Sequence, residues 1–584
     1  MDSLVVSSVL RRLFRHPACQ SRRNLATLSS CLQHSRRRAT QRQHHHQHHQ
    51  HPPRRTMATR DTLRGAKRGT AATESGWQQR TSVITLDMSG EYKTYPTVTA
   101  NDLRSHRDRP RRVKMLMRDF IEDSLYNPHY GYFSKQAVIF SPGEPFDFNA
   151  LADEPAFHAE LARRYTEFED ALDARAGAPD LTRQLWHTPT ELFRPYYGEA
   201  VARYLLSNYV MSTYPYHDLI IYEMGAGRGT LMLNVLDYIR DVEPAVYDRT
   251  KYKIIEISSS LAALQTQQLR QSGASSSSSS SSSAAAGSPS DAAAAARARG
   301  HADKVEIINK SIFDWDAPVP SPCFFLAMEV FDNFAHDVLR YDLVTEEPLQ
   351  GVVLIDAAGD FHEFYEPALD PVAARYLRVR HAATGGAYPL PYGPSSPSRF
   401  ACSSSSSSSS SSLSSSLSSP PPPSPLAARL AALSTLSWRL LRRLRAALPF
   451  APNLSGPEYV PTRLMQFFDV LERRFPAHRL VAADFAALPG AVRGLGGPVV
   501  QTRYARRTVP VSTPLVHQGY FDILFPTDFR VVEALYRALT GKLTRRFSHE
   551  AFVRSWAYVD DTRTRSGENP LLSWYRNANV LVTV

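Results

Sequence analysis

The sequence is poor in features that mark several common classes of protein. Only four cysteines occur among its 584 residues, and no two are spaced as Cys-x-x-Cys. Neither a zinc site nor a disulfide framework is therefore supported, and we expect no bound metal. No apolar stretch reaches the roughly 18 residues that a membrane-spanning helix requires. We therefore expect no transmembrane segment.

Acidic residues are nearly absent from the first 60 positions. Residues 1–60 contain twelve arginines and a single acid, Asp2, so that this segment carries +11 of the chain's net charge of +12. The remaining 524 residues are close to neutral. A nucleic-acid surface needs its basic residues on the folded domain, so we expect no nucleic-acid partner.

The N-terminal segment 1–56 has the composition of a mitochondrial presequence. It is rich in Arg and Ser, and Leu4, Leu10 and Phe14 can share one face of a helix. A secretory signal would need a longer unbroken apolar region. The alternative is a disordered basic tail. The presequence interpretation predicts localisation to the mitochondrial matrix.

Low-complexity stretches divide the rest of the chain. Residues 275–300 are mostly Ser and Ala, and residues 403–425 are Ser followed by Pro. Neither can bury enough apolar surface to offset its ordering entropy, so we expect both to be disordered. The basic segment 426–448 can form a helix that rests on an anionic membrane surface or packs as part of an insertion. The expected segments are a presequence (1–56), a disordered linker (57–110), an N-terminal helical and aromatic segment (111–210), an α/β core (211–366), an insertion (367–455) and the C-terminal part of the core domain (456–584).

Apolar strands alternate with helices in the predicted core. An apolar run at 218–223 leads into a glycine-rich loop and a helix at 230–240. Further strands are predicted at 252–258, 305–309, 323–328, 352–357, 479–485 and 579–584. Continuous apolar strands separated by helices indicate a mostly parallel sheet covered on both faces. The predicted fold class is α/β with a Rossmann-like core.

The glycine-rich loop has the sequence EMGAGRGT and begins at Glu223. It lacks the Lys of a P-loop, and Thr230 replaces the third glycine of a dinucleotide fingerprint. The residues that remain are spaced as Glu-x-Gly-x-Gly-x-Gly: Glu223, Gly225, Gly227 and Gly229. This pattern resembles motif I of the Rossmann-like S-adenosylmethionine (SAM) methyltransferases. Glycine lets the backbone turn and approach such a ligand closely, and the alternative is a turn that uses glycine only for packing.

Other polar residues near the loop have predicted roles in holding SAM. Glu223, at the end of its strand, can interact with the ammonium group of the ligand. Thr230 can cap the following helix. Glu256, in the segment KIIEIS, ends the next predicted strand and is placed to accept hydrogen bonds from the ribose hydroxyls. The loop, the strand before it and this second acid together predict a SAM site.

An ordered set of motifs resembles the MidA-like family. The motifs are LYNPHYGYF (125–133), TPTELFRPYYGE (188–199), EMGAGRGTLMLNVL (223–236), KIIEISSSL (253–261) and MEVFDN (328–333). The resemblance covers roughly 112–134, 187–366 and 456–540. It implies a class I SAM-dependent methyltransferase core with an N-terminal helical extension and additional C-terminal elements. The mitochondrial member of the family is a protein arginine methyltransferase, so the resemblance also implies a role in assembly of respiratory complex I and a peripheral-arm subunit as substrate.

The sequence departs from the family pattern at several points. Met328 stands where the family has Asn, and AADF (482–485) replaces the family's I-D-Y-G. These changes leave the cofactor motif intact and bear on the choice of substrate. The alternatives are therefore a methyltransferase with another substrate and a non-catalytic assembly factor that uses the fold for docking.

The family motifs also imply further contacts with the cofactor. Thr188 and Glu191 are carried over from the segment before the Gly-Glu helix as cofactor-side residues. Asp314, after the third strand, is placed to meet the adenine end, or it is an ordinary turn residue.

Two acids after the fourth predicted strand are the candidate catalytic residues. Glu329 and Asp332 are placed at the carboxyl edge of the sheet, where substrates bind in such folds. Their i, i+3 spacing lets both point into one cleft, and carboxylates can clamp the planar guanidinium of an arginine. The alternative is that either acid caps the next helix or pairs with a surface base. Three aromatic residues can wall the cleft or belong to the core: Tyr130, Tyr132 and Phe133.

Overall fold

The computed structural model describes residues 77–80, 86–135, 137–274, 300–386, 388, 440 and 453–584. The predicted presequence lies outside these residues, as does the tract at 403–425. Almost all of 275–300 and of the basic segment 426–448 also lies outside them.

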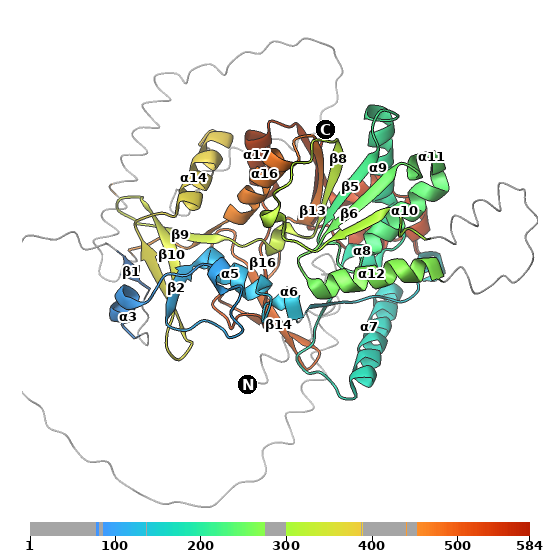
Figure 1. The fold of residues 1–584 in the computed structure, drawn as a ribbon. Helices are drawn as coiled ribbons and strands as arrows, with labels where there is room; N and C mark the ends of the chain where they lie inside the picture. Colours follow the sequence, from blue (N-terminus) through green and yellow to red (C-terminus); the bar gives the residue numbers. More distant parts are fainter. Residues whose placement is uncertain are drawn as a thin grey trace, which may run out of the picture. The chain divides into compact units, whose positions relative to one another are not determined.

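A seven-stranded sheet forms the centre of the described domain (Figure 1). All pairings from β7 through β13 are parallel, and β18 runs antiparallel to both of its neighbours. This arrangement confirms the predicted α/β fold with a Rossmann-like core. In spatial order the strands are β7 (Val305–Ile308), β6 (Thr250–Ile255), β5 (Leu219–Met224), β8 (Cys323–Met328), β13 (His478–Phe485), β18 (Ala578–Thr583) and β17 (Thr544–Ser548).

Helices cover both faces of this sheet (Figure 1). Side chains of β5 alternate between the faces, so Ile221 packs in one apolar cluster and Tyr222 in the other. On the Ile221 side lie α9 (Tyr196–Ser212), α10 (Thr230–Val242) and α18 (His549–Trp556). On the Tyr222 side lie α14 (Pro371–Ala383), α16 (Thr462–Arg474) and α17 (Phe529–Thr540). Because α14 packs against α16 and α17 on this side of the sheet, the predicted insertion at 367–455 is wrong for its first residues, which belong to the core.

A second, six-stranded sheet is antiparallel throughout. Its strands are β1 (Gln78–Gln79), β11 (Phe361–Glu366), β10 (Pro348–Ile355), β9 (Asp337–Tyr341) and β12 (Glu458–Val460), with β2 (Val113–Leu116) paired to β10. The sequence predicts the apolar run 352–357 as part of the main strand pattern, but its first four residues belong to β10 of this second sheet and the last two follow that strand. An apolar run alone does not distinguish the two sheets, because a buried antiparallel strand is as apolar as a parallel one.

The disordered linker predicted over 57–110 is wrong for its described residues. β1 pairs with β11, and residues 86–110 contain α3 (Ser89–Thr94) and α4 (Ala100–Leu103). Tyr92 is buried and stacks on Phe364 with ring centroids 4.0 Å apart. Aromatic and apolar residues spaced among polar ones are enough to attach this segment to the second sheet.

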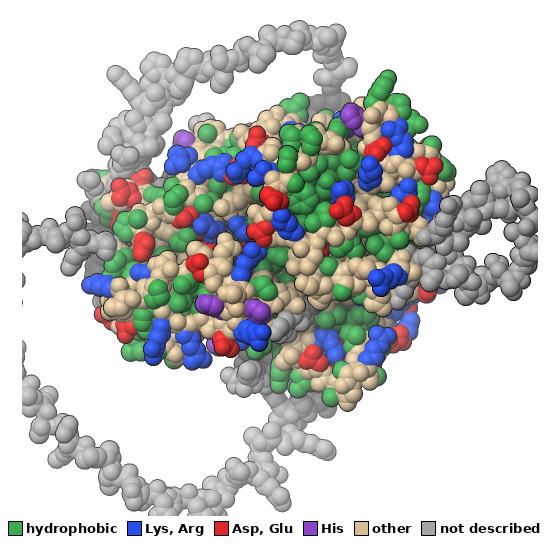
Figure 2. Space-filling view, in the orientation of Figure 1, with side chains coloured by type: hydrophobic (Ala, Val, Ile, Leu, Met, Phe, Trp, Pro, Cys, Tyr) green, Lys and Arg blue, Asp and Glu red, His purple; other side chains and the backbone are tan. Residues whose placement is uncertain are grey.

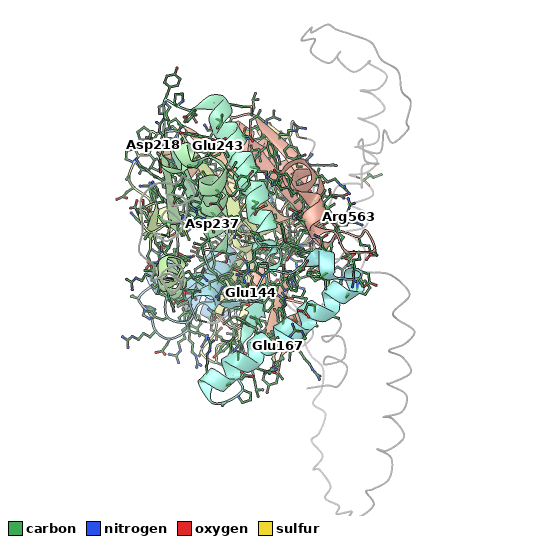
Figure 3. All side chains as sticks on the ribbon, turned by 90° about the vertical axis from the view of Figure 1, so that its right-hand side faces the viewer. Glu144, Glu167, Asp218, Asp237, Glu243 and Arg563 are labelled. Atoms are coloured by element: carbon green, nitrogen blue, oxygen red, sulfur yellow. The ribbon has the colours of Figure 1, made fainter. Side chains whose placement is uncertain are left out.

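The remaining elements surround these two sheets. In the side view of Figure 3 the long helix α7 carries Glu167, and α10 carries Asp237. No helix of the described residues is long and apolar enough to cross a membrane. The other helices and strands are α5 (Met117–Tyr126), α6 (Tyr132–Lys135), β3 (Ala137–Ile139), α7 (Glu154–Ala176), β4 (Gln184–Trp186), α8 (Pro189–Leu192), α11 (Pro244–Tyr247), α12 (Ser259–Ala274), β14 (Val499–Tyr504), β15 (Arg507–Val511), β16 (Asp522–Leu524) and α19 (Pro570–Ser573).

Candidate active site

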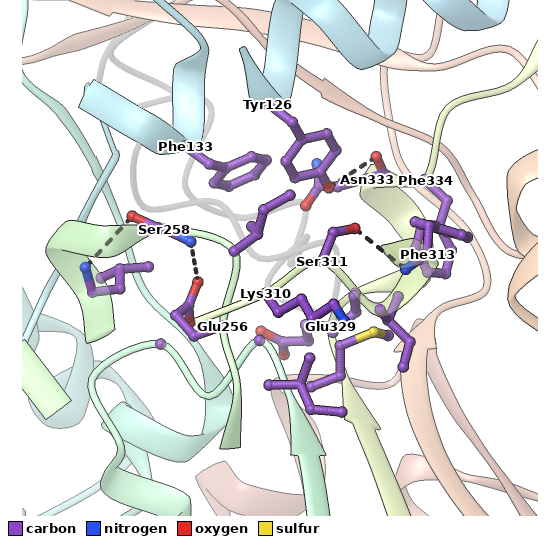
Figure 4. Close-up of a pocket in the computed structure, with 18 of the residues that line it drawn as sticks. Tyr126, Phe133, Glu256, Ser258, Lys310, Ser311, Phe313, Glu329, Asn333 and Phe334 are labelled. Atoms are coloured by element: carbon purple, nitrogen blue, oxygen red, sulfur yellow. Dashed lines mark hydrogen bonds between the residues drawn. The ribbon is translucent and has the colours of Figure 1, made fainter. Parts of the chain in front are cut away.

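A cleft of about 890 Å³ lies at the carboxyl ends of the parallel strands (Figure 4). The strand order reverses between β5 and β8, and ligands of open α/β sheets bind at such a reversal. Gly225, Gly227, Glu256, Ser311 and Glu329 line the cleft, and they follow β5, β6, β7 and β8.

The three loop glycines have conformations that favour glycine. Their φ angles are +69° at Gly225, +55° at Gly227 and +84° at Gly229, all in the left-handed region. A Cβ on Gly227 would lie 2.8 Å from Cδ1 of Ile139, which itself lines the cleft. The loop therefore needs glycine both for its backbone conformation and to leave room at the cleft wall.

Thr230 does not cap the following helix. The N-cap of α10 is Gly229, and no side chain completes the cap. The Thr230 hydroxyl instead donates a hydrogen bond to Glu191, which is 2% exposed. Thr188 caps α8, because its side chain accepts a hydrogen bond of 3.2 Å from the Glu191 N–H. Thr188 and Glu191 thus lie behind the cleft wall, where Glu191 joins α8 to the glycine loop.

Glu223 also lies behind the loop. Its buried carboxylate accepts a hydrogen bond of 2.7 Å from the Tyr252 hydroxyl. Burial raises the pKa of Glu223 to about 7, and the hydrogen bond from Tyr252 opposes this shift. A direct contact of Glu223 with the ligand ammonium remains a prediction.

Glu256 lies on the cleft wall, as its position after the second strand predicts. Its Oε1 accepts a hydrogen bond of 2.9 Å from the Ser258 N–H, and its Oε2 accepts one of 3.1 Å from Gln265 Nε2. Burial raises the pKa of Glu256 to about 7. Gln265 Nε2 also lies 2.9 Å from the Gly227 carbonyl, so this residue, which the sequence motifs did not single out, fixes Glu256 relative to the glycine loop.

The residues on this side of the cleft fit SAM. The open backbone at Gly225 and Gly227 leaves space for a ligand, and Glu256 supplies a carboxylate that accepts hydrogen bonds from hydroxyl groups. Ile257 and Phe313 add apolar walls. These residues would hold the cofactor, which supplies an electrophilic methyl group on a sulfonium.

Asp314 is turned away from the cleft. Its carboxylate forms an ion pair of 3.1 Å with Arg104, and its side chain is 47% exposed. The predicted contact with the adenine end is therefore replaced by a surface ion pair, consistent with an ordinary turn residue. Four neighbours from the same turn line the cleft instead: Lys310, Ser311, Ile312 and Phe313.

Glu329 lies at the cleft in an unusual backbone conformation. Its φ of +55° is in the left-handed region, and its N–H donates to the Ala483 carbonyl at 2.8 Å. Burial, and then the nearby Asp484, raise the pKa of Glu329 well above its usual value. The structure gives its carboxyl group no hydrogen-bond or ion-pair partner among the described residues. Strain of this kind in a non-glycine residue is typical of functional sites.

Asp332 lies beneath Glu329 and does not line the cleft. Its Oδ1 is buried without a hydrogen-bond partner, and burial raises the pKa of Asp332 well above its usual value. The 3-10 turn over Phe331–Asn333 has no side-chain cap. Neither acid therefore caps this turn or forms an ion pair with a described base, so both alternative roles are excluded. The structure brings the two acids together but exposes only Glu329 to a ligand.

Two further acids join this group, and motif analysis missed both. Asp484, at the end of β13, accepts hydrogen bonds from the N–H groups of Phe331 (2.7 Å) and Asp332 (3.2 Å). Asp522 accepts one of 3.2 Å from Asn333 Nδ2. Burial raises the pKa of both acids to about 7. The segment AADF places Asp484 at the carboxyl end of a parallel strand, which is the signal that could have identified it.

Aromatic side chains form the opposite wall of the cleft. Tyr126 and Phe133 lie across it from Glu256 and Glu329 (Figure 4), and their rings stack with centroids 5.5 Å apart. Tyr132 is buried in the core, and the Tyr130 hydroxyl donates to Asp123. Of the three aromatic residues proposed from the sequence, Phe133 alone lines the cleft, whereas Tyr126 and Trp186 were missed.

Several known proteins are similar to this chain. The chain is 20% identical over 468 residues to the mitochondrial protein arginine methyltransferase NDUFAF7 homolog of Schizosaccharomyces pombe, covering 79% of this chain and 82% of that protein. It is similar to a Burkholderia thailandensis protein solved with S-adenosyl-homocysteine, with 14% identity, a TM-score of 0.43 and coverage of 80% of this chain and 87% of the other. It is also similar to the glycopeptide N-methyltransferase MtfA in complex with SAM, with 10% identity, a TM-score of 0.23 and coverage of 66% and 92%.

A family model whose description reads "Putative S-adenosyl-L-methionine-dependent methyltransferase" matches residues 200–548, which is more than half of the chain. The matched region includes the glycine loop, Glu256, Glu329 and Asp484. The resemblance to the MidA-like family is thereby confirmed, and the chain belongs to this family of SAM-dependent methyltransferases.

Proposed function

We propose that this protein is a mitochondrial protein arginine methyltransferase that supports assembly of respiratory complex I by methylating a subunit of its peripheral arm, in the matrix. Three observations support the proposal. The N-terminus is basic and almost free of acids. The S. pombe relative is named as a mitochondrial protein arginine methyltransferase. Glu329, a carboxyl group without a partner among the described residues, lines the cleft.

The unpaired carboxyl group of Glu329 carries the proposal. A buried carboxylate without a cation is costly, and an opposite charge in contact with it relieves that cost. Asp332, Asp484 and Asp522 lie behind Glu329 and make this end of the cleft strongly acidic in character. A guanidinium satisfies this environment well, because it is planar, permanently charged and able to donate two parallel hydrogen bonds to one carboxylate.

The residues of the cleft would prepare an arginine for methylation in three ways. Glu329 binds one edge of the guanidinium and orients its free nitrogen. Tyr126 and Phe133 exclude water and offer ring faces to the cation. The positive charge of the bound guanidinium favours the ionised form of Glu329, which can then accept the proton that the guanidinium nitrogen releases when the new N–C bond forms. Asp484 holds the turn that places Glu329.

The test combines a cellular measurement with a matched pair of variants. Methylarginine in complex I subunits is measured by mass spectrometry in cells that lack the gene and carry the wild-type chain, Glu329→Gln or Glu306→Gln. Glu306 is on β7 with its side chain 59% exposed, it pairs with Lys253, and neither residue lines the cleft. The wild type and Glu306→Gln should restore the modification, and Glu329→Gln should not. Unchanged methylation without the gene would overturn the arginine and complex I assignments, even if the protein binds SAM.

A further inference from the structure

A second cavity of about 1190 Å³ lies against the six-stranded antiparallel sheet. One wall is the sheet face formed by β9, β11 and β12, and the other is formed by loops around residues 454–457, 492–493 and 512–514. It shares no lining residue with the methyltransferase cleft. Its polar lining residues are Arg80, Arg340, Glu363, Ser455, Arg493, Ser512 and Thr513.

The charge of this cavity is positive and not compensated from within. Arg80 forms an ion pair with Glu363 at 3.0 Å, so these two residues neutralise each other. Arg340 and Arg493 have no ion-pair partner among the described residues. The cavity therefore presents two guanidinium groups that no acid of the described residues neutralises.

Arg340 holds a fixed position in the cavity wall. It extends from β9, and its Nη1 donates to the Ser455 carbonyl at 3.0 Å. Its guanidinium carbon lies 5.1 Å from the centre of the Tyr365 ring, which fixes its direction. The guanidinium thus lines the cavity in a defined orientation, and no acid of the described residues forms an ion pair with it.

The other walls define what kind of molecule fits. Ser512 and Thr513 offer hydroxyl groups, and the rings of Tyr365, Tyr459 and Pro457 add apolar surface. Guanidinium groups such as those of Arg340 and Arg493 recognise carboxylates and phosphates by paired, charge-assisted hydrogen bonds. A concave site of this composition favours a compact ligand over an extended surface contact.

We propose that this cavity binds a small molecule that carries two anionic groups, either carboxylates or phosphates, between Arg340 and Arg493. The site is separate from methyl transfer, and the proposal does not depend on the acceptor of the methyl group. Carboxylates and phosphates share the chemistry that these residues recognise, so the experiment contains one probe of each kind.

The experiment is calorimetric titration of the full chain with pyrophosphate and with citrate, at fixed ionic strength. We expect at least one probe to bind with a Kd below about 1 mM. Arg493→Gln should weaken that binding by about tenfold or more, because it removes a charge-assisted hydrogen bond. Arg340→Gln should have the same effect. The matched control is Arg554→Gln, an exposed arginine on α18 that pairs with Glu550, and its binding should match that of the wild type.

Titration with SAM accompanies each variant and shows that it is folded. Because Arg493 is exposed, its substitution tests the site even if Arg340→Gln fails to fold. Three results would overturn the proposal: neither probe binds, binding persists in a folded Arg493→Gln, or Arg554→Gln weakens binding equally. Binding of a hexaglutamate peptide alone would also overturn it, since the occupant would then be an acidic segment of a protein.

Discussion

The two cavities of this protein differ in the kind of ionisable group that lacks a partner. The cleft at the parallel sheet ends in Glu329, a carboxyl group without a cation among the described residues, and the cavity on the antiparallel sheet contains Arg340, a guanidinium without an anion among them. Elsewhere on the face shown in Figure 2, acidic and basic side chains of the described residues are interspersed. A ligand of opposite charge stabilises the ionised form of such a group, so each cavity indicates the charge of the ligand that it would bind.

A substitution in the glycine loop should have the largest effect, because it should abolish ligand binding in one cavity and leave the other unchanged. Gly227→Val places a β-branched side chain at a φ of +55° and at the cleft wall, which strains the backbone and fills ligand space. We expect SAM affinity to fall by more than about 100-fold, equivalent to roughly 2.7 kcal/mol, in a calorimetric titration. Pyrophosphate or citrate binding at the other cavity should be unchanged.

Gly143→Val is the control for the glycine-loop variant. Gly143 also has a positive φ, of +78°, but an added Cβ meets nothing within 4 Å. This variant carries similar backbone strain outside the cleft and should bind SAM as the wild type does. Equal loss of SAM binding in both variants would show that strain alone, and not the shape of the cleft, explains the effect.

A smaller effect is expected at Glu256. Glu256→Gln keeps the size of the side chain and removes the charge, and hydrogen bonds to a charged group contribute about 1.5–3 kcal/mol. SAM affinity should therefore fall by about tenfold or more. Because the pKa of Glu256 is raised to about 7, wild-type affinity should also fall as the pH drops from 8 to 6, and this pH dependence should be weaker in the variant. An identical pH dependence in both proteins would contradict the assignment.

The acidic cleft also predicts an unusual dependence of stability on pH. The folded-state pKa values of Glu223, Glu256, Asp484 and Asp522 are raised to about 7, mainly by burial. Between their unfolded values near 4 and this value the folded state binds more protons than the unfolded state, so stability falls as pH rises through this window. The Tm without ligand should be at least about 2 °C lower at pH 7.5 than at pH 5.5.

The variant Asp522→Asn tests how much one of these four carboxyl groups contributes to the pH dependence of the Tm. Asparagine can still accept the hydrogen bond from Asn333, but it does not titrate. The decrease in Tm between pH 5.5 and pH 7.5 should be smaller in this variant than in the wild type. A Tm that rises over this interval in the wild type would contradict the burial of these carboxyl groups.

Sequence patterns predicted the parts of this site that depend on local backbone structure. The strand, the three glycines and Glu256 follow from local spacing, because their roles depend on backbone conformation and on strand ends. Asp484 and Asp522 could not be identified in the same way. They reach Glu329 from segments more than 150 residues distant in the sequence, and only the packing of β13 and β16 brings them together.

For the fold, too, local sequence patterns predicted the regular elements but not the contacts between distant segments. Alternating apolar runs predicted the parallel sheet, because each strand is buried on both faces. They did not separate β10 from that sheet or identify the elements within residues 86–110. These short elements depend on contacts such as Tyr92 on Phe364, which link segments about 270 residues apart. Thr230 and Asp314 fit a local pattern, yet their side chains make contacts that the pattern does not specify.

Asp314 provides the smallest expected effect. Asp314→Asn removes the exposed ion pair with Arg104, and such pairs contribute about 0–1 kcal/mol to stability. Because the side chain does not line the cleft, SAM affinity should stay within about twofold of the wild-type value, a change of roughly 0.4 kcal/mol. The sequence predicted that both Asp314 and Glu256 contact SAM. Measuring the SAM affinities of Asp314→Asn and Glu256→Gln in one calorimetric series tests whether only Glu256 contributes to binding. If Asp314→Asn weakened SAM binding as much as Glu256→Gln, the turn after β7 would have to reorganise when the ligand binds, and Asp314 would regain the adenine-side role that its position after the strand first indicated.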